Sequence, residues 1–285
     1  MAPPAYLDLG KDARDLFTKG FFFNLFKLES KSKTKSNVEF TFSGNSNIDT
    51  KTVAGFLETK YKWKDYGTTI KEKWSTDNLL LTDISCEDYL MKGVKIGMET
   101  LFSPNTGKKN AFIKTAFKHD NFHLANDFEI PYIGSSPITI GTSAVFVYDS
   151  WLAGCHMVYD ATRSKLTKAN YAFGYRGSDF TIHTNCNESN DIGVSLHQLI
   201  KPGFESGVQI GYTLGNQSTK LGFACKYQID QFSTLRAKVN NASQVGLSYT
   251  HRLKDGVALT LSSLIDGKNL NQGGHQMGLA LEIET

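Results

Sequence analysis

Basic side chains at alternate positions are the feature of this sequence with the clearest chemical meaning. In several segments a lysine or arginine occupies every second position and shares that parity with other polar residues. If such positions line a confined aqueous passage, their fixed cations raise the local concentration of anions such as phosphates and nucleotides. The alternative is solubilising charge near the ends of strands. The positions concerned are Lys60, Lys62, Lys71, Lys73, Lys95, Lys114, Lys118, Lys220, Lys226, Arg236 and Lys238.

Glu72 has the opposite parity from the lysines around it. It alternates with Ile70 and Trp74, whereas Lys71 and Lys73 belong to the other set. If the lysines face water, Glu72 faces lipid, where a carboxylate is costly and marks a functional site. The alternative is a register slip or a bulge that brings this side chain near the lipid headgroups.

Motifs of enzymes and metal sites are weak in this sequence. His119 and His123 are four residues apart but lie in strand-like sequence, so no metal site is predicted. The four cysteines are far apart, which predicts free thiols. Residues 103–109 lack the leading Gly and the Ser or Thr of a phosphate loop, so a hairpin turn is predicted. With no Gly-x-Gly-x-x-Gly motif and no Ser-His-Asp set, we expect neither an enzyme nor a required cofactor.

The elements that position these residues begin with one amphipathic helix, predicted over residues 5–19. Pro3 and Pro4 precede it and Gly20 follows it. Apolar residues recur along it at three-to-four spacing, and charged residues fill the opposite side. Those charged residues include Lys11, Arg14 and Lys19.

After Gly20 the sequence period changes to two and stays there. Tyr61 and Trp63 alternate with Lys60 and Lys62, and comparable runs with one apolar and one polar side recur along the chain. Turn signals separate these runs at a spacing of about 12 to 15 residues. Antiparallel hairpins over so long a stretch imply one closed sheet, because closure alone removes edge strands. The expected count is roughly 18 to 20 strands.

Composition excludes several classes of protein. No apolar run reaches the roughly 20 residues that a membrane-spanning helix needs. A formal net charge of +3 is too mild to imply a nucleic-acid partner. A closed sheet this wide would leave an interior too large for its side chains to fill. The apolar side therefore needs lipid, and we expect a membrane β-barrel whose polar side lines water. The start of the sequence shows no secretory signal, so a bacterial outer-membrane route is not expected.

Several segments resemble the voltage-dependent anion channels, the mitochondrial porins of eukaryotes, and the match runs from end to end. They are PPAYLDLGKDARDLFTKG at the start, LETKYKWKDYG, EKWSTDN, SPNTGKKNA, WLAG at 151–154, KYQID at 226–230, AKVNNAS at 237–243 and LIDGKN with GGH at 264–275. The resemblance implies an all-β fold, a single transmembrane barrel of about nineteen strands. Residues 1–20 would form a helix inside the pore, and residues 21–285 the barrel.

The resemblance also assigns roles to individual residues. Nucleotide contact and selectivity are implied for Lys11, Arg14, Lys19 and Lys95, lipid contact and gating for Glu72, and a hinge for Gly20. A region that contacts NAD is implied at Gln244, Val245, Gly246, Ser262, Ser263, Leu264, Ile265 and Asp266. Phe112 stands where the family usually has a basic residue, and Lys71 adds one, so the strength of anion selectivity is left open.

The implied function is a voltage-gated, weakly anion-selective channel for ATP, ADP, phosphate and organic anions across the mitochondrial outer membrane. ATP and NAD are expected as ligands, and the lipid bilayer, hexokinase, apoptosis regulators and further copies of the chain as partners. One alternative is a diverged barrel that acts mainly as a docking scaffold for hexokinase or apoptosis regulators. The related protein-import pore and a soluble lipid-binding barrel are weaker alternatives, because of the start of the sequence and its length.

Overall fold

The computed structural model describes residues 3–89, 91–131, 137–188, 191–214, 218–271 and 273–285. The chain divides into two units. The first contains residues 1–9, 32–42 and 54–173. The second contains residues 10–31, 43–53 and 174–285. None of the described helices combines the length and apolar character that crossing a membrane would require.

Nineteen strands belong to one sheet. They are β1 (Leu25–Lys33), β2 (Val38–Asn47), β3 (Val53–Trp63), β4 (Thr68–Ser75), β5 (Leu80–Glu87), β6 (Val94–Ser103), β7 (Lys108–Lys118), β8 (Phe122–Pro131), β9 (Thr139–Tyr148), β10 (Trp151–Asp160), β11 (Lys165–Arg176), β12 (Phe180–Cys186), β13 (Asp191–Lys201), β14 (Phe204–Thr213), β15 (Ser218–Gln228), β16 (Ser233–Asn240), β17 (Gln244–Lys254), β18 (Val257–Asp266) and β19 (Gln276–Glu284). Strand β1 pairs with both β2 and β19, so the hydrogen-bonded order returns to its first strand. The predicted β-barrel of about nineteen strands is confirmed.

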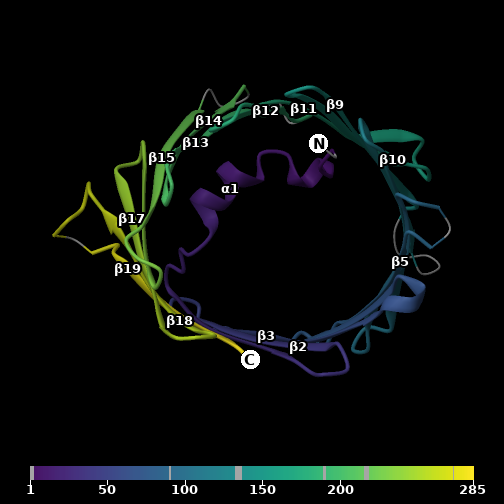
Figure 1. Cartoon of the computed structure of the whole chain (residues 1–285), viewed down its shortest axis with the longest axis horizontal. Helices are drawn as coiled ribbons and strands as arrows, with labels where there is room; N and C mark the ends of the chain where they lie inside the picture. The colour runs from purple at the N-terminus through teal and green to yellow at the C-terminus, as the bar shows by residue number, and fades with distance from the viewer. Residues whose placement is uncertain (1–2, 90, 132–136, 189–190, 215–217, 272) are drawn as a thin grey trace. The chain divides into compact units, whose positions relative to one another are not determined.

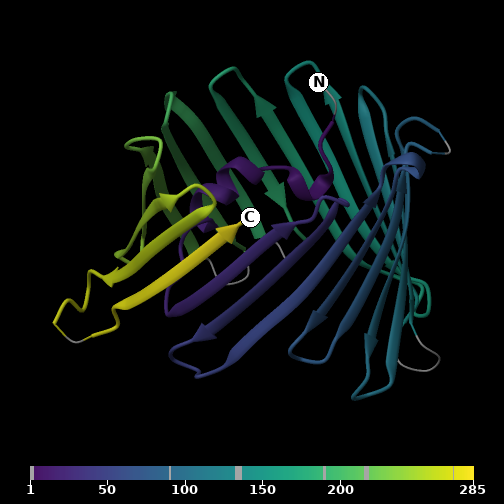
Figure 2. The same ribbon diagram turned by 60° about the horizontal axis from the view of Figure 1, so that its bottom comes forward.

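The pairing of the first strand with the last is parallel. Its register runs from Phe26 opposite Leu279 to Lys31 opposite Glu284, and Figure 2 shows β1 and β19 side by side with the same direction. An up-and-down sheet with an odd number of strands can close only in this way, because its first and last strands point in the same direction. The sequence count of 18 to 20 strands left this point open.

Side chains alternate across the sheet as the two-residue period predicts. In the first unit, Leu57 lies opposite Trp74, and Lys60 lies opposite Lys71. Leu57, Tyr61 and Trp74 are 50%, 36% and 59% exposed. Large apolar side chains this exposed need a solvent other than water. We call the side that carries them the apolar face, and the side that carries Lys60 and Lys71 the polar face.

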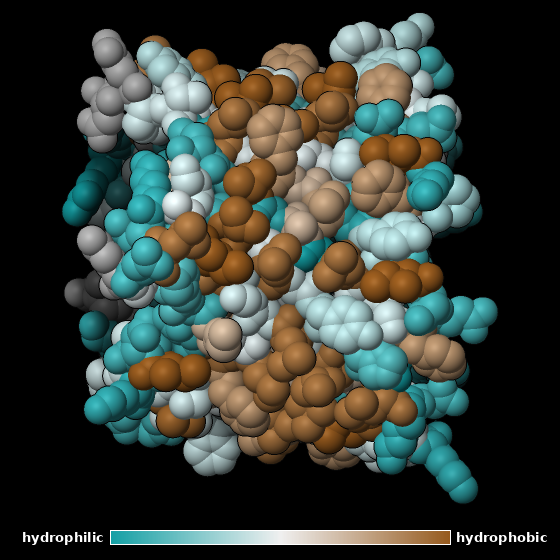
Figure 3. Space-filling model, turned by 90° about the vertical axis from the view of Figure 1, so that its left-hand side faces the viewer, coloured by the Kyte–Doolittle hydropathy of each residue, from teal (hydrophilic) through white to brown (hydrophobic). Residues whose placement is uncertain are grey.

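The second unit shows the same alternation. Val208 lies opposite Phe223, and Phe223 lies opposite Val239. These three residues belong to the apolar face, whereas Gln209 and Lys226 lie at positions of the other parity. Figure 3 shows apolar side chains gathered over strands β15 to β19. Because the alternation repeats from strand to strand, the two faces continue through the unit.

The N-terminal segment differs from the single helix predicted over residues 5–19. A short 3₁₀ turn occupies Tyr6–Asp8, and helix α1 spans Lys11–Thr18. Gly10 separates them with a left-handed φ of +67°, a conformation that glycine adopts without steric cost. A Cβ atom at Gly10 would lie 2.7 Å from the ring of His183. The prediction of one continuous helix was therefore wrong, because the apolar spacing continues across a residue that breaks the helix.

The apolar side of the N-terminal segment is buried as predicted. In the first unit, Leu9 packs in a cluster with Val145, Leu152 and Ala172. In the second unit, Ala13 and Leu16 of α1 are buried. Burying a leucine side chain contributes roughly 1.5–3 kcal/mol, so these contacts hold the segment against the strands.

Candidate functional site

Helix α1 packs on the polar face of strands β13, β14 and β15 (Figure 1). Two glycines make the close approach possible. A Cβ atom at Gly207 would lie 2.8 Å from the Leu16 side chain, and one at Gly222 would lie 3.0 Å from the Phe17 ring. Glycine in a strand interior often marks such a close approach. That α1 lies on the polar face is observed, whereas its predicted place inside a pore stays a prediction.

Lys19, one of the predicted nucleotide contacts, borders a cavity of about 480 Å³ beside α1. Its ammonium group lies 2.6 Å from the carboxylate of Asp15. Glu205, on the wall of the same cavity, accepts hydrogen bonds from Lys226 (2.8 Å) and pairs with His197 (3.3 Å). Three carboxylates and three cations line this cavity, together with His197, which makes it a polar site of nearly balanced charge.

Of the other predicted nucleotide contacts, Lys11 and Arg14 lie on α1 but do not line this cavity. Lys11 and Arg14 are exposed on α1. Lys95 is on β6 of the first unit, where its ammonium lies 3.8 Å from the carboxylate of Glu87. Lys11, Arg14 and Lys19 belong to the second unit. The structure therefore places Lys11, Arg14 and Lys19 in one unit and leaves the place of Lys95 relative to them open.

The cations predicted on strands all fall on the polar face. Glutamates on the same face balance part of their charge. The pairs are Lys60–Glu39 (3.4 Å), Lys71–Glu58 (3.1 Å), Lys95–Glu87 (3.8 Å), Lys114–Glu99 (2.6 Å) and Lys226–Glu205 (2.8 Å). Phe112, opposite Glu99, also lies on this face, without a charge of its own. The polar face is therefore basic only in moderate excess.

The two segments of the predicted NAD region are adjacent strands. In the register of β17 and β18, Gln244 lies opposite Asp266 and Gly246 opposite Leu264, on the polar face. Val245 lies opposite Ile265, on the apolar face. By the same parity, Ser262 points to the polar face and Ser263 to the apolar face. The structure thus brings the predicted residues together, but three of the eight, Val245, Ser263 and Ile265, point away from any ligand on the polar face.

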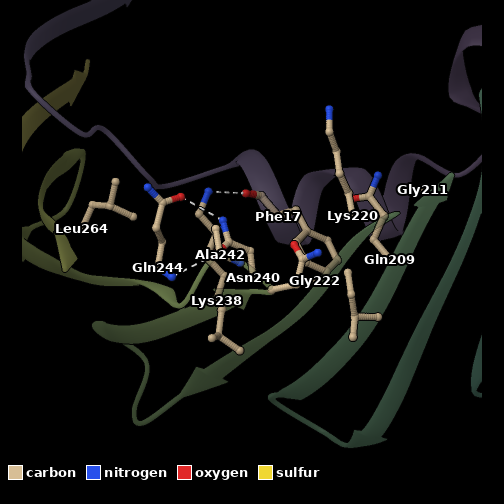
Figure 4. Close-up of a pocket in the computed structure, with 14 residues that line it drawn as sticks. Phe17, Gln209, Gly211, Lys220, Gly222, Lys238, Asn240, Ala242, Gln244 and Leu264 are labelled. Atoms are coloured by element: carbon tan, nitrogen blue, oxygen red, sulfur yellow. Dashed lines mark hydrogen bonds between the residues drawn. The ribbon is translucent and has the colours of Figure 1, made fainter. Parts of the chain in front are cut away.

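A cavity of about 470 Å³ lies where this region meets the end of α1. Figure 4 shows Gln244 and Leu264 on one side of it, with Phe17 and Lys238 between them and Gln209. The Asn240 amide donates to the Gln244 side-chain oxygen (2.9 Å). Gln209 and Asn240 carry no motif in the sequence; their polar parity along β14 and β16 is the signal that points to this face.

Gly20, the predicted hinge, is enclosed by the strands. Its φ is +81°, and a Cβ atom there would collide with the guanidinium of Arg236. Arg236 donates from Nη1 to the backbone oxygen of Lys19 (2.8 Å), and the Ser248 hydroxyl donates to the oxygen of Gly20. The conformation therefore requires glycine, but the backbone on both sides of the predicted hinge is hydrogen-bonded to the sheet.

In the first unit, the residues before α1 pack on β9 and β10. The Tyr6 ring stacks on His156, with ring centroids 5.5 Å apart. Burial, together with the nearby Cys155, raises the pKa of the Tyr6 hydroxyl above its ordinary value. Tyr6 therefore stays neutral at physiological pH and packs here as an uncharged aromatic side chain.

Glu72 lies on the apolar face of the first unit. It is opposite Thr59 on β3 and Thr82 on β5. Ile70 and Trp74 flank it on its own strand, and the Glu72 side chain is exposed. The regular register leaves no bulge in the described pairing of β4, so the carboxylate shares its face with side chains suited to lipid.

Comparisons with known proteins agree with this arrangement. The family model of the eukaryotic porins matches residues 2–278. The chain belongs to the eukaryotic porin family. The match covers α1 and nearly all of the strands, so both the N-terminal segment and the sheet are features of the family.

Curated relatives of this porin are half identical to it. "Non-selective voltage-gated ion channel VDAC2" of Meleagris gallopavo and of Homo sapiens are each 50% identical over 283 residues, which cover 99% of this chain and 95% of the relative. The protein of the same name from Xenopus laevis is 50% identical over 283 residues and is covered to 99%. This porin therefore spans almost the whole length of these relatives.

The position of Glu72 yields a prediction about the stability of this porin. Glu72→Gln removes a carboxylate from the apolar face, so the free energy of unfolding in lipid vesicles is expected to rise by about 1 kcal/mol. Glu58→Gln is the matched control on the polar face, where loss of the Lys71 pair is expected to lower it by at most about 1 kcal/mol. Urea titration of both variants checks the signs, and an equal change in both would contradict the assignment of faces.

Proposed function

We propose that this chain forms a voltage-gated channel that passes small anionic metabolites across the mitochondrial outer membrane. The single observation that carries the proposal is the segregation of side chains. Exposed apolar residues occupy one face of the sheet, and lysines, glutamates and helix α1 occupy the other. A membrane barrel with a wet, charged interior requires this separation. The family and the names of the relatives point to a channel rather than an enzyme.

Anion selectivity is expected to be weak. Fixed cations favour anions in a confined aqueous passage, but carboxylates pair with Lys60, Lys71, Lys114 and Lys226 on the polar face. A cation whose charge is balanced nearby attracts a passing anion less than an unpaired one. The excess of basic over acidic residues in the whole chain is only 31 against 28.

Gating follows from the charge that moves when the protein changes conformation. Moving one elementary charge through the full membrane field changes the energy by about 2.3 kcal/mol per 100 mV. The charges of Lys11 and Arg14 on α1, and of Lys19 directly after it, are partly offset by Asp12 and Asp15 of the same helix. Voltage would therefore act on α1 together with the charged strands that it contacts.

ATP and NAD are the ligands we propose for the polar face. The adenine nucleotide is assigned to the basic residues of α1, and the dinucleotide to the cavity formed by Phe17, Gln209, Gln244 and Leu264. A role mainly as a docking scaffold is not favoured. Binding of hexokinase or apoptosis regulators, and association of several copies of the chain, stay predictions of the family resemblance.

Planar-bilayer recording of the purified protein tests the proposed function. We expect discrete conductance steps that close as the voltage increases in magnitude. In a tenfold salt gradient the reversal potential should have the sign of anion preference and fall well short of the roughly 59 mV of ideal selectivity. Absence of voltage-dependent steps, or a reversal potential of the opposite sign, would contradict the proposal.

The dinucleotide proposal predicts a pattern of perturbed residues. Titration with NADH, followed by backbone NMR in micelles, is expected to shift the amides of Gln244, Gly246 and Leu264 more than those of Val245 and Ile265. Gln244→Ala should weaken binding about 2- to 10-fold, the loss expected for one hydrogen bond. Val245→Ala is the control on the apolar face and should leave the affinity unchanged. Equal effects of both variants would rule out this cavity.

A further inference from the structure

Lys238 holds the end of helix α1. Its Nζ donates to the backbone oxygen of Phe17 at 2.9 Å, as Figure 4 shows. The last carbonyl groups of a helix have no partner within the helix, and they carry the negative end of its dipole. A half-buried lysine on β16 thus supplies both the missing donor and a favourable charge, across a separation of 221 positions in sequence.

The same ammonium group also contacts the segment that follows the helix. It lies 4.2 Å from the centre of the Phe21 ring and 5.0 Å from that of Phe23. Cations at such distances are attracted to the faces of aromatic rings. Gly246, on the neighbouring strand, leaves room for this arrangement, because a Cβ there would lie 2.9 Å from the Phe23 ring and 3.0 Å from the Lys238 stem.

Neighbouring side chains hold the backbone between these contacts. Arg236 donates to the oxygen of Lys19, and Ser248 donates to the oxygen of Gly20. The backbone N–H of Phe22 donates to the hydroxyl of Ser262 (3.0 Å). Ser248 and Ser262 are 2% and 5% exposed. Strands β16, β17 and β18 therefore all bind residues 17–22, with Lys238 at the point where the helix ends.

We infer that Lys238 is a positioning residue: its charge fixes residues 17–23 on the sheet and does not serve to attract passing anions. Two aromatic rings and a carbonyl group surround its ammonium, which leaves little of it for a solute. Lys220 provides the contrast. It borders the same cavity, but it is exposed and extends away from the Phe17 carbonyl (Figure 4). The inference rests on the proposed channel function and assigns separate tasks to two lysines of equal charge.

Lys238→Met and Lys220→Met each remove one positive charge from the same cavity, but only Lys238→Met also removes the contact with α1. Their comparison therefore distinguishes the effect of losing that contact from the effect of losing a charge. In planar bilayers, Lys238→Met is expected to shift the voltage of half-closure and to leave the reversal potential unchanged. Lys220→Met should move the reversal potential toward zero with normal gating. Lys238→Arg keeps both the donor and the cation over the rings, so it should restore wild-type gating.

A readout that does not depend on conductance accompanies these recordings. Hydrogen exchange of the Phe22 amide is expected to accelerate about tenfold in Lys238→Met and to stay unchanged in Lys220→Met, since only the former releases the segment. Should Lys238→Met fail to fold, the double variant Phe21→Leu, Phe23→Leu removes the rings and leaves the sheet intact. It should shift gating in the same direction as Lys238→Met, without changing selectivity.

The outcomes separate this inference from the proposed function. If both lysine variants change the reversal potential equally, with gating and Phe22 exchange as in the wild type, Lys238 is a selectivity residue and the inference is overturned. Normal gating in the folded Phe21→Leu, Phe23→Leu variant would also overturn it. Absence of voltage-dependent steps from the wild-type protein would instead contradict the proposed function, whereas the exchange result would still report on the role of Lys238.

Discussion

Every backbone N–H and C=O group that lies in hydrocarbon needs a partner within the protein, because lipid offers none. The sheet meets this constraint because β1 pairs with both β2 and β19, so the ladder has no free edge. Once the backbone is paired in this way, successive side chains must point to opposite faces. Apolar side chains can then be exposed on one face only if the charged ones occupy the other, and the placement of α1, the cavities and the cations all depend on that division.

Ion pairs are frequent on the polar face, where five of the eleven cations predicted on strands lie within 4 Å of a glutamate oxygen. Glu58, Glu99 and Glu205 each lie within 3.1 Å of a lysine nitrogen on the same face. Such pairs are only partly shielded by water, so they fix side-chain positions as well as lowering the net field. The ammonium group of Lys238 contacts the N-terminal segment instead of a carboxylate, and we infer that it fixes the position of that segment. A wide passage of low net charge would admit many solutes and prefer anions only slightly.

Much of the fold follows from local pattern, whereas the contacts of the N-terminal segment do not. The alternation of Tyr61 with Lys60 and of Trp74 with Lys73 predicts which face each residue occupies, and the register agrees. It also places Glu72 correctly on the apolar face. The helix prediction was wrong at Gly10, because the spacing of apolar residues carries no information about a residue with a left-handed φ. The bond from Lys238 to Phe17 joins residues 221 positions apart, and no local pattern encodes such a contact.

The central claim, that one face of the sheet contacts lipid and the other contacts water, can be measured most directly with tryptophan as a probe. In a background with Trp63, Trp74 and Trp151 replaced by Phe, single tryptophans are placed at Phe223 and Leu247 on the apolar face and at Gln209 on the polar face. Brominated acyl chains should quench the first two, and aqueous iodide only the third. Quenching of all three probes by the same agent, or the reverse pattern, would contradict the account.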